Sequence, residues 1–240
     1  MIKFFQKLKA KKGFTLVELI VVIAIIGVLA AILVPTMLGY VTSSRVTSAN
    51  STASSLKNNI DTFLTNADTA GYGMKLSSGA QCTLTMTIDA DGEWTVAVGA
   101  GTAFGEGEGD GATGSGTDAF KTGGSLQWED EGTTTADMTK AEATDATTLL
   151  ALELKGLFPE VKSSCARAYI QGGKSMYLWY TADDADGEDV GTTPGVEDFE
   201  AETFAWDGNT AGVNDEGLIM GTAPALTLGT ASADDAGDGE

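Results

Sequence analysis

The chain has 240 residues and is strongly acidic, with 34 Asp and Glu against 14 Lys and Arg and a formal net charge of −20. Such a charge repels phosphate backbones and anionic headgroups, which argues against direct nucleic-acid binding by the acidic part of the chain. The chain has no histidine and carries neither a Gly-x-Ser-x-Gly motif nor a phosphate-binding Gly-Lys loop, so we expect no catalysis and no cofactor.

Residues 1–13 form a basic leader, which is followed by an apolar stretch. The leader holds five lysines and no acid, so residues 14–240 carry nine basic and 34 acidic side chains, a net charge of −25. The apolar stretch, residues 14–34, would extend about 31 Å as a helix, which matches the hydrocarbon layer of a membrane. The lysines predict that the leader stays in the cytoplasm and that the rest of the chain lies outside. The alternative is a buried core helix of a soluble protein.

A single acid, Glu18, lies near the start of the apolar stretch. A carboxylate costs roughly 2.5–3.5 kcal/mol near the centre of a membrane and less near its edge, so Glu18 should have a partner. Cleavage after Gly13 would create an α-amino group on Phe14, and that group could neutralise Glu18 of a neighbouring copy. Alternatively, Glu18 lies at the membrane edge and reaches water.

The stretch "KKGFTLVELIVVIAIIGVLAAILVP", residues 11–35, resembles the class III signal of type IV pilins and pseudopilins. The resemblance covers roughly residues 1–65. It implies cleavage between Gly13 and Phe14 by a prepilin peptidase, N-methylation of Phe14, and recruitment of the N-terminus of an adjacent subunit by Glu18. It also implies a helical homopolymer that is built by pilus or type II secretion assembly machinery.

The helix is predicted to continue outside the membrane over residues 35–67. Apolar residues recur there at three- and four-residue spacing between Ala49 and Leu64, a pattern typical of a helix that buries one face. Acidic, polar and glycine residues between Asn66 and Gly73 predict its end.

Gly27 and Pro35 lie inside the predicted helix and should weaken it. Pro35 has no N–H, so it leaves the carbonyl of Ala31 without its helical partner. The pilin resemblance implies that residues 27–35 can lose helical form in a filament. Alternatively, both residues are tolerated and have no role.

Residues 68–229 are predicted to form a β-rich body. Alternating apolar residues and glycine-containing turns predict three strand pairs, at residues 82–88 and 94–98, 165–170 and 175–181, and, more weakly, 202–206 and 217–221. A short helix is expected at residues 147–158, capped by Asp145 or Thr144 and ended by Pro159. The expected fold class is α+β and pilin-like: a long N-terminal helix, half of it transmembrane, packed on an antiparallel sheet. The glycine-rich stretch 99–124 and the acidic tail 230–240 are expected to be irregular.

Cys82 and Cys165 are the two cysteines of the chain. Outside the cytoplasm they are predicted to form a disulfide, which would contribute roughly 4 kcal/mol by closing a long loop. The alternative is two separate buried thiols.

No metal site is expected. The acidic stretches "DADGE" and "DDADGED" share the Asp-x-Asp-Gly core of a calcium loop. Both lack the acid at the first position and the glutamate at the twelfth that such a loop needs. They are better explained as solvated turns.

Tyr177 and Trp179 share one face of a predicted strand. Flat aromatic rings on such a face could stack on the sugar rings of a polysaccharide. Alternatively, they are core residues.

The predicted function is that of a structural subunit of a type IV pilus, with adhesion, including adhesion to polysaccharide, as an added role. The chain would be a single-pass membrane protein before assembly and extracellular afterwards. The alternative function is that of a pseudopilin, or of a minor or competence pilin, in secretion or DNA uptake.

Overall fold

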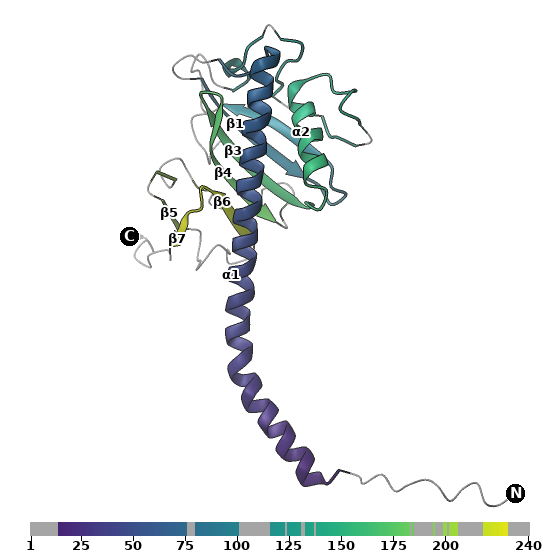
Figure 1. Cartoon of the computed structure of the whole chain (residues 1–240), viewed down its shortest axis with the longest axis vertical. Helices are drawn as coiled ribbons and strands as arrows, with labels where there is room; N and C mark the ends of the chain where they lie inside the picture. Colours follow the sequence, from purple (N-terminus) through teal and green to yellow (C-terminus); the bar gives the residue numbers. More distant parts are fainter. Residues whose placement is uncertain are drawn as a thin grey trace, which may run out of the picture. The chain divides into compact units, whose positions relative to one another are not determined.

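The computed structural model describes residues 14–75, 80–100, 116–122, 124–130, 133–136, 138–182, 184, 194, 199–200, 202–205 and 218–229. The chain divides into two compact units after Thr42. The described part of the first unit is the N-terminal half of helix α1 (Leu16–Ala70), and the second unit contains the rest of α1 and all other elements (Figure 1). We refer to the second unit as the body.

Helix α1 confirms the predicted long N-terminal helix and has 55 residues. It is helical throughout, including at Gly27 and Pro35. The end of the helix is formed by Gly71, which has a φ of 91° and therefore adopts a conformation that favours glycine. The N–H of Tyr72 donates to the carbonyl of Ala67 at 3.0 Å and so satisfies one of the last carbonyls of the helix.

The body is built on a five-stranded antiparallel sheet with the order β2-β1-β3-β4-β6. Its strands are β1 (Gln81–Ile88), β2 (Trp94–Ala100), β3 (Ser164–Gln171), β4 (Lys174–Ala182) and β6 (Ile219–Ala223). The first two predicted hairpins, β1–β2 and β3–β4, are confirmed. At the β1–β2 turn, the Asp89 carboxylate accepts the N–H groups of Asp91 and Glu93 at 2.9 and 2.8 Å. This acid therefore stabilises a turn.

The predicted third strand pair is wrong. Strand β5 (Thr203–Ala205) pairs in parallel with β7 (Thr227–Gly229), whereas β6 pairs antiparallel with β4 at the edge of the large sheet. Pairing with β4 buries all five residues of β6. A strand pair that formed only between β5 and β6 would leave this short apolar strand without that cover.

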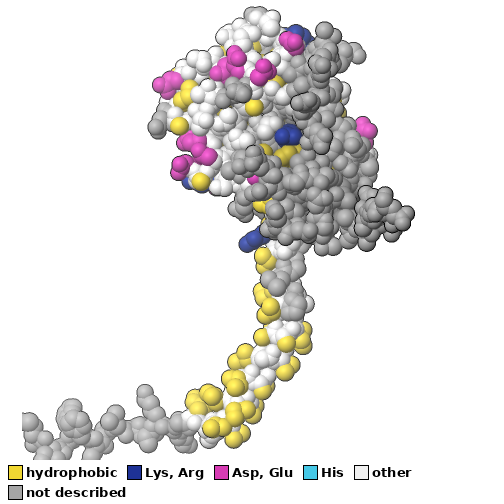
Figure 2. Space-filling view, turned by 180° about the vertical axis from the view of Figure 1, so that it is seen from behind, with side chains coloured by type: hydrophobic (Ala, Val, Ile, Leu, Met, Phe, Trp, Pro, Cys, Tyr) yellow, Lys and Arg dark blue, Asp and Glu magenta, His cyan; other side chains and the backbone are white. Residues whose placement is uncertain are grey.

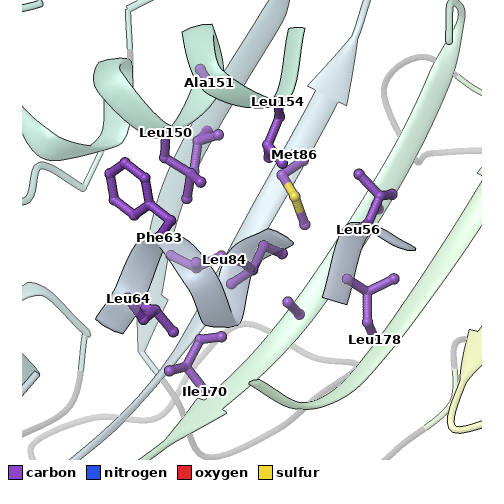
Figure 3. Close-up of a cluster of buried hydrophobic side chains, with 14 of the residues drawn as sticks. Leu56, Phe63, Leu64, Leu84, Met86, Leu150, Ala151, Leu154, Ile170 and Leu178 are labelled. Carbon is purple, nitrogen blue, oxygen red and sulfur yellow. The ribbon is translucent and has the colours of Figure 1, made fainter. Parts of the chain in front are cut away.

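Helices α1 and α2 (Ala146–Leu157) cover the same face of the sheet, which we call the inner face (Figure 1). The predicted cap of α2 is confirmed, since the Asp145 carboxylate accepts the N–H of Thr148 at 2.7 Å. Figure 3 shows the centre of the core, with side chains from both helices directed toward those of the central strands. The labelled residues are Leu56, Phe63, Leu64, Leu84, Met86, Leu150, Ala151, Leu154, Ile170 and Leu178.

Polar side chains and a loop satisfy backbone groups at both edges of the sheet. At the β6 edge, the N–H of Thr222 donates to Oδ1 of Asn50 on α1 at 2.8 Å. At the β2 edge, the N–H of Val98 donates to the carbonyl of Asp130 at 3.1 Å. Such contacts protect edge strands from pairing with other chains.

The predicted irregular stretch 99–124 is only partly described. Strand β2 continues to Ala100, a short 3-10 helix η1 (Gly116–Ala119) follows, and residues 101–115 lie outside the described residues. Phe120 is buried and stacks on Trp128 with a centroid distance of 4.0 Å. This part of the stretch therefore belongs to the core. The tail 230–240 lies outside the described residues.

The close approach of α1 to β6 can be tested with Gly221→Ala. A Cβ at Gly221 would lie 2.1 Å from the carbonyl carbon of Ala49, so the variant must displace the helix or the strand. We expect a loss of about 1–3 kcal/mol in the free energy of unfolding, measured by urea titration of the detergent-solubilised chain with tryptophan fluorescence. The control is Gly156→Ala in α2, where a Cβ meets no atom within 4 Å and should stabilise the helix by up to about 1 kcal/mol. Equal stability of the two variants would contradict the close approach.

Candidate functional site: the exposed N-terminal half of α1

The N-terminal half of α1 is an apolar surface that the described protein does not cover. Residues Leu16–Val34 form a stretch of 19 residues with a mean hydropathy of 3.1, of which no part is buried. Hydrophobic side chains gather along this stretch in Figure 2. At about 1.5 Å per residue it extends about 28 Å, so by length and composition it can cross a membrane.

Glu18 has partners within its own helix. Its Oε2 atom accepts the backbone N–H of Thr15 at 2.8 Å and the hydroxyl of Thr15 at 2.7 Å. The N–H of Glu18 in turn donates to the Thr15 hydroxyl oxygen at 3.2 Å. This reciprocal arrangement is a capping box, in which residues at the N-cap and N3 positions satisfy each other's backbone N–H groups. The spacing Thr-x-x-Glu could have indicated it from the sequence.

One carboxylate oxygen of Glu18 is left for another donor. All hydrogen bonds to this carboxylate from the described residues go to Oε2, and both come from Thr15. An ionised carboxylate offers about four acceptor sites on its two oxygens. The capping box therefore fixes the side chain over the start of the helix, while Oε1 remains available.

Of the two predicted processing residues, only Phe14 can be located. It directly precedes the capping box, and its side chain is 86% exposed. Gly13 and the rest of the leader lie outside the described residues.

Gly27 and Pro35 do not interrupt the helix. A Cβ at Gly27 would meet no atom within 4 Å, so the described fold gives no steric reason for a glycine there. Beside Pro35, the hydroxyl of Thr36 donates to the carbonyl of Leu33 at 2.9 Å. Whether residues 27–35 change conformation in a filament stays a prediction.

The predicted disulfide between Cys82 and Cys165 is wrong. Cys82 pairs with Ile170 across β1 and β3, whereas Cys165 pairs with Thr87, so the two cysteines lie five positions apart along the ladder. They also belong to different clusters, Cys82 to the inner-face core and Cys165 to the cluster on the opposite face. A disulfide needs Cα atoms closer than about 7 Å, and five strand residues extend about 16 Å. The alternative interpretation, two separate buried thiols, agrees with the structure.

The structure also does not support the predicted sugar-binding aromatics. Trp179 is only 1% exposed and packs in the cluster on the opposite face with Phe199, Leu218 and Met220. Tyr177 is half-buried and stacks on Phe199 at a centroid distance of 4.8 Å. The Trp179 ring thus has no free face for a sugar, which agrees with the alternative interpretation of these residues as core.

The comparisons with known proteins agree with the geometry of this helix. Residues 8–34 match the family described as prokaryotic N-terminal methylation motif. The chain is 42% identical over 79 residues to a fimbrial protein of Moraxella nonliquefaciens, which covers 30% of this chain and 51% of that protein. It is 54% identical over 50 residues to a fimbrial protein of Pseudomonas aeruginosa, covering 21% and 32%. It is 41% identical over 61 residues to the type IV major fimbrial protein FimA of Dichelobacter nodosus, covering 25% and 39%.

The chain spans about a third to a half of the length of these relatives. No solved structure matches the chain.

The free state of the two cysteine thiols can be tested by alkylation. Burial raises the pKa of the Cys82 thiol, so the thiol should stay protonated and unreactive in the folded chain even at pH 8.5, where an ordinary cysteine is about half ionised. In urea without a reductant, iodoacetamide should label both Cys82 and Cys165, as it does in a reduced control. A Cys82–Cys165 linked peptide in the unreduced sample would contradict the described register.

Proposed function

We propose that this chain, whose N-terminal segment is similar to those of type IV fimbrial proteins, is a structural subunit of a type IV pilus. The proposal places it in the membrane before assembly, with the body outside the cytoplasm, and in an extracellular filament afterwards. Adhesion to polysaccharide is not part of the proposal, because Trp179 is buried.

The observation that carries this proposal is the exposed apolar half of α1. An unpartnered apolar surface of this size is unfavourable in water and needs either lipid or other protein to cover it. Lipid covers it in the single chain, and the equivalent helices of other copies cover it in a filament.

Processing would supply the charge that assembly needs. Cleavage by a prepilin peptidase between Gly13 and Phe14 would leave an α-amino group on Phe14, the residue that precedes the capping box. Among apolar helices this amine needs a counter-charge, since an unpaired charge in such a place is strongly unfavourable. Glu18 of the neighbouring copy would provide it through Oε1, while Oε2 stays bound to Thr15.

The names of the relatives favour the structural subunit over the pseudopilin alternative. Two are fimbrial proteins, and that of Dichelobacter nodosus is a type IV major fimbrial protein. A subunit that works only in secretion or DNA uptake would assemble by the same helix, so copy number in surface filaments distinguishes the two functions.

The mature protein should begin at Phe14 and carry a methyl group on its amine. N-terminal peptide mass spectrometry of filaments sheared from cells checks this, with the peptidase-deficient strain as the control that retains residues 1–13. An intact leader in assembled filaments, or cleavage beyond Val34, would contradict the proposed processing.

The charge of Glu18 and its part in the capping box can be tested separately. Glu18→Gln keeps the capping box, because glutamine also serves at the N3 position, but it removes the charge. Thr15→Ala removes the cap and keeps the charge. If the charge pairs with a neighbouring copy, Glu18→Gln and Glu18→Ala should each reduce the amount of sheared filament by at least about tenfold. Thr15→Ala should reduce it less.

Membrane level and processed fraction are measured alongside the filament yield, in a strain without the native copy. All three variants should insert and be cleaved like the wild type. Normal filaments from Glu18→Gln would show that Glu18 acts only as a cap, and loss of processed monomer would assign the residue to insertion or recognition.

A further inference from the structure

Arg167 lies at the centre of the sheet face opposite α1, which we call the outer face. It is on β3, where it pairs with Thr85 of β1 on one side and with Trp179 of β4 on the other. Figure 2 views the body from behind, and few Lys and Arg side chains are visible among its coloured atoms. Arg167 is half-buried there.

The guanidinium of Arg167 is held in one position. Its Nε donates to the hydroxyl of Thr85 at 3.2 Å, and its central carbon lies 5.6 Å from the centroid of the Trp179 ring. Because Trp179 is itself 1% exposed and packed, it is a rigid support. The two terminal nitrogens of Arg167 bond no acceptor among the described residues. Nitrogens arranged in this way form a fixed fork that matches the two oxygens of a carboxylate.

Among the described residues, no ion pair joins Arg167 to an acid. Its nearest neighbours on the outer face, within the described residues, are uncharged, namely Thr83, Thr85, Thr87, Cys165, Tyr169, Tyr177, Trp179 and Thr181. Elsewhere in the body, four of the cations form ion pairs within the chain, namely Lys57, Lys121, Lys140 and Lys155. Arg167 thus combines a fixed orientation with an unused charge in a strongly acidic protein.

We propose that Arg167 is a binding site for a carboxylate that a second copy of the chain supplies in the filament. This inference rests on the proposed filament function. A carboxylate fits because the fork can bind it in a bidentate way. A second copy fits because residues 14–240 of every copy carry a net charge of −25. That charge repels free polyanions, whereas packing of the apolar helices holds neighbouring copies close despite it.

The first test is a zero-length cross-link in filaments made of equal amounts of isotopically light and heavy Arg167→Lys subunits. Carbodiimide joins a lysine to a carboxylate only where the two are in contact. The lysine introduced by Arg167→Lys should yield linked peptides that combine a light and a heavy chain. Links only within one chain, or no link at this lysine, would overturn the proposal. Wild-type filaments treated in the same way show which links come from native lysines.

The second test measures the critical concentration for assembly of purified full-length chain. Arg167→Gln should raise it by about tenfold, because it removes a charge-assisted contact from every subunit. The matched control is Lys174→Gln, which removes the same charge from an exposed lysine with no ion pair in the described residues, and which should change it by less than about twofold. Equal values for the two variants would overturn the proposal.

Two further readouts keep the outcomes distinct. If Arg167→Gln lowers the melting temperature of the monomer as much as it impairs assembly, the cross-link decides between a structural and an intersubunit role. If preformed wild-type filaments bind polygalacturonate, Arg167→Gln filaments do not, and no intersubunit link forms, the site belongs to an acidic polysaccharide and the proposal is wrong. If wild-type chain forms no filament, the proposed function itself fails.

Discussion

The structure depends on one continuous helix that has to satisfy two different environments. Up to Val34, α1 is exposed and apolar apart from Glu18, and from Ala49 onward it buries a single face against the sheet. Within the body, the stripe that the sheet covers fixes the rotation of the second half of α1 about its axis. The stripe contains Ala49, Ala53, Leu56, Ile60, Phe63, Leu64 and Ala67. The body is therefore built around α1, and removal of this half of the helix would expose the inner face of the sheet.

Close contact with α1 explains several features of the sheet. Gly221 has no side chain because the backbone of Ala49 occupies the space that a Cβ would need. Asn50 and Asp61 then lie near enough to accept backbone N–H groups of β6 and β4, at 2.8 and 2.6 Å. These bonds satisfy strand groups that would otherwise be left without partners at the edge and start of the strands. Small residues at the crossing and polar residues beside it together fix the register of the helix on the sheet.

The sequence predicted those parts of the fold that local patterns control. Apolar periodicity predicted α1, and turn residues such as Gly92 and Gly172 predicted the hairpins that they form. The pairing of β6 with β4 and the close approach of Gly221 to α1 are contacts between distant segments, which local patterns do not show. The disulfide was predicted only from the expected location outside the cytoplasm and from the presence of two cysteines. Neither shows that Cys82 and Cys165 lie on opposite faces of the sheet. Alternation left the role of Trp179 open between sugar binding and core, because it shows which residues share a face but not whether later segments such as Leu218 cover that face.

An acid near the start of a helix has a simple local explanation, so the capping box alone does not assign Glu18 to assembly. A carboxylate in the first turn is favoured by the helix dipole and by the N–H groups that it accepts. A glutamine would accept the same bonds from Thr15 without the cost of placing a charge near lipid. The chain nevertheless carries a glutamate, and a charge that is costly for the single chain becomes favourable only when a cation faces it. The described residues of the first unit contain no lysine or arginine. The proposed cleavage would also remove the five lysines of the leader, so in the processed chain that cation would come from the new N-terminus or from another molecule.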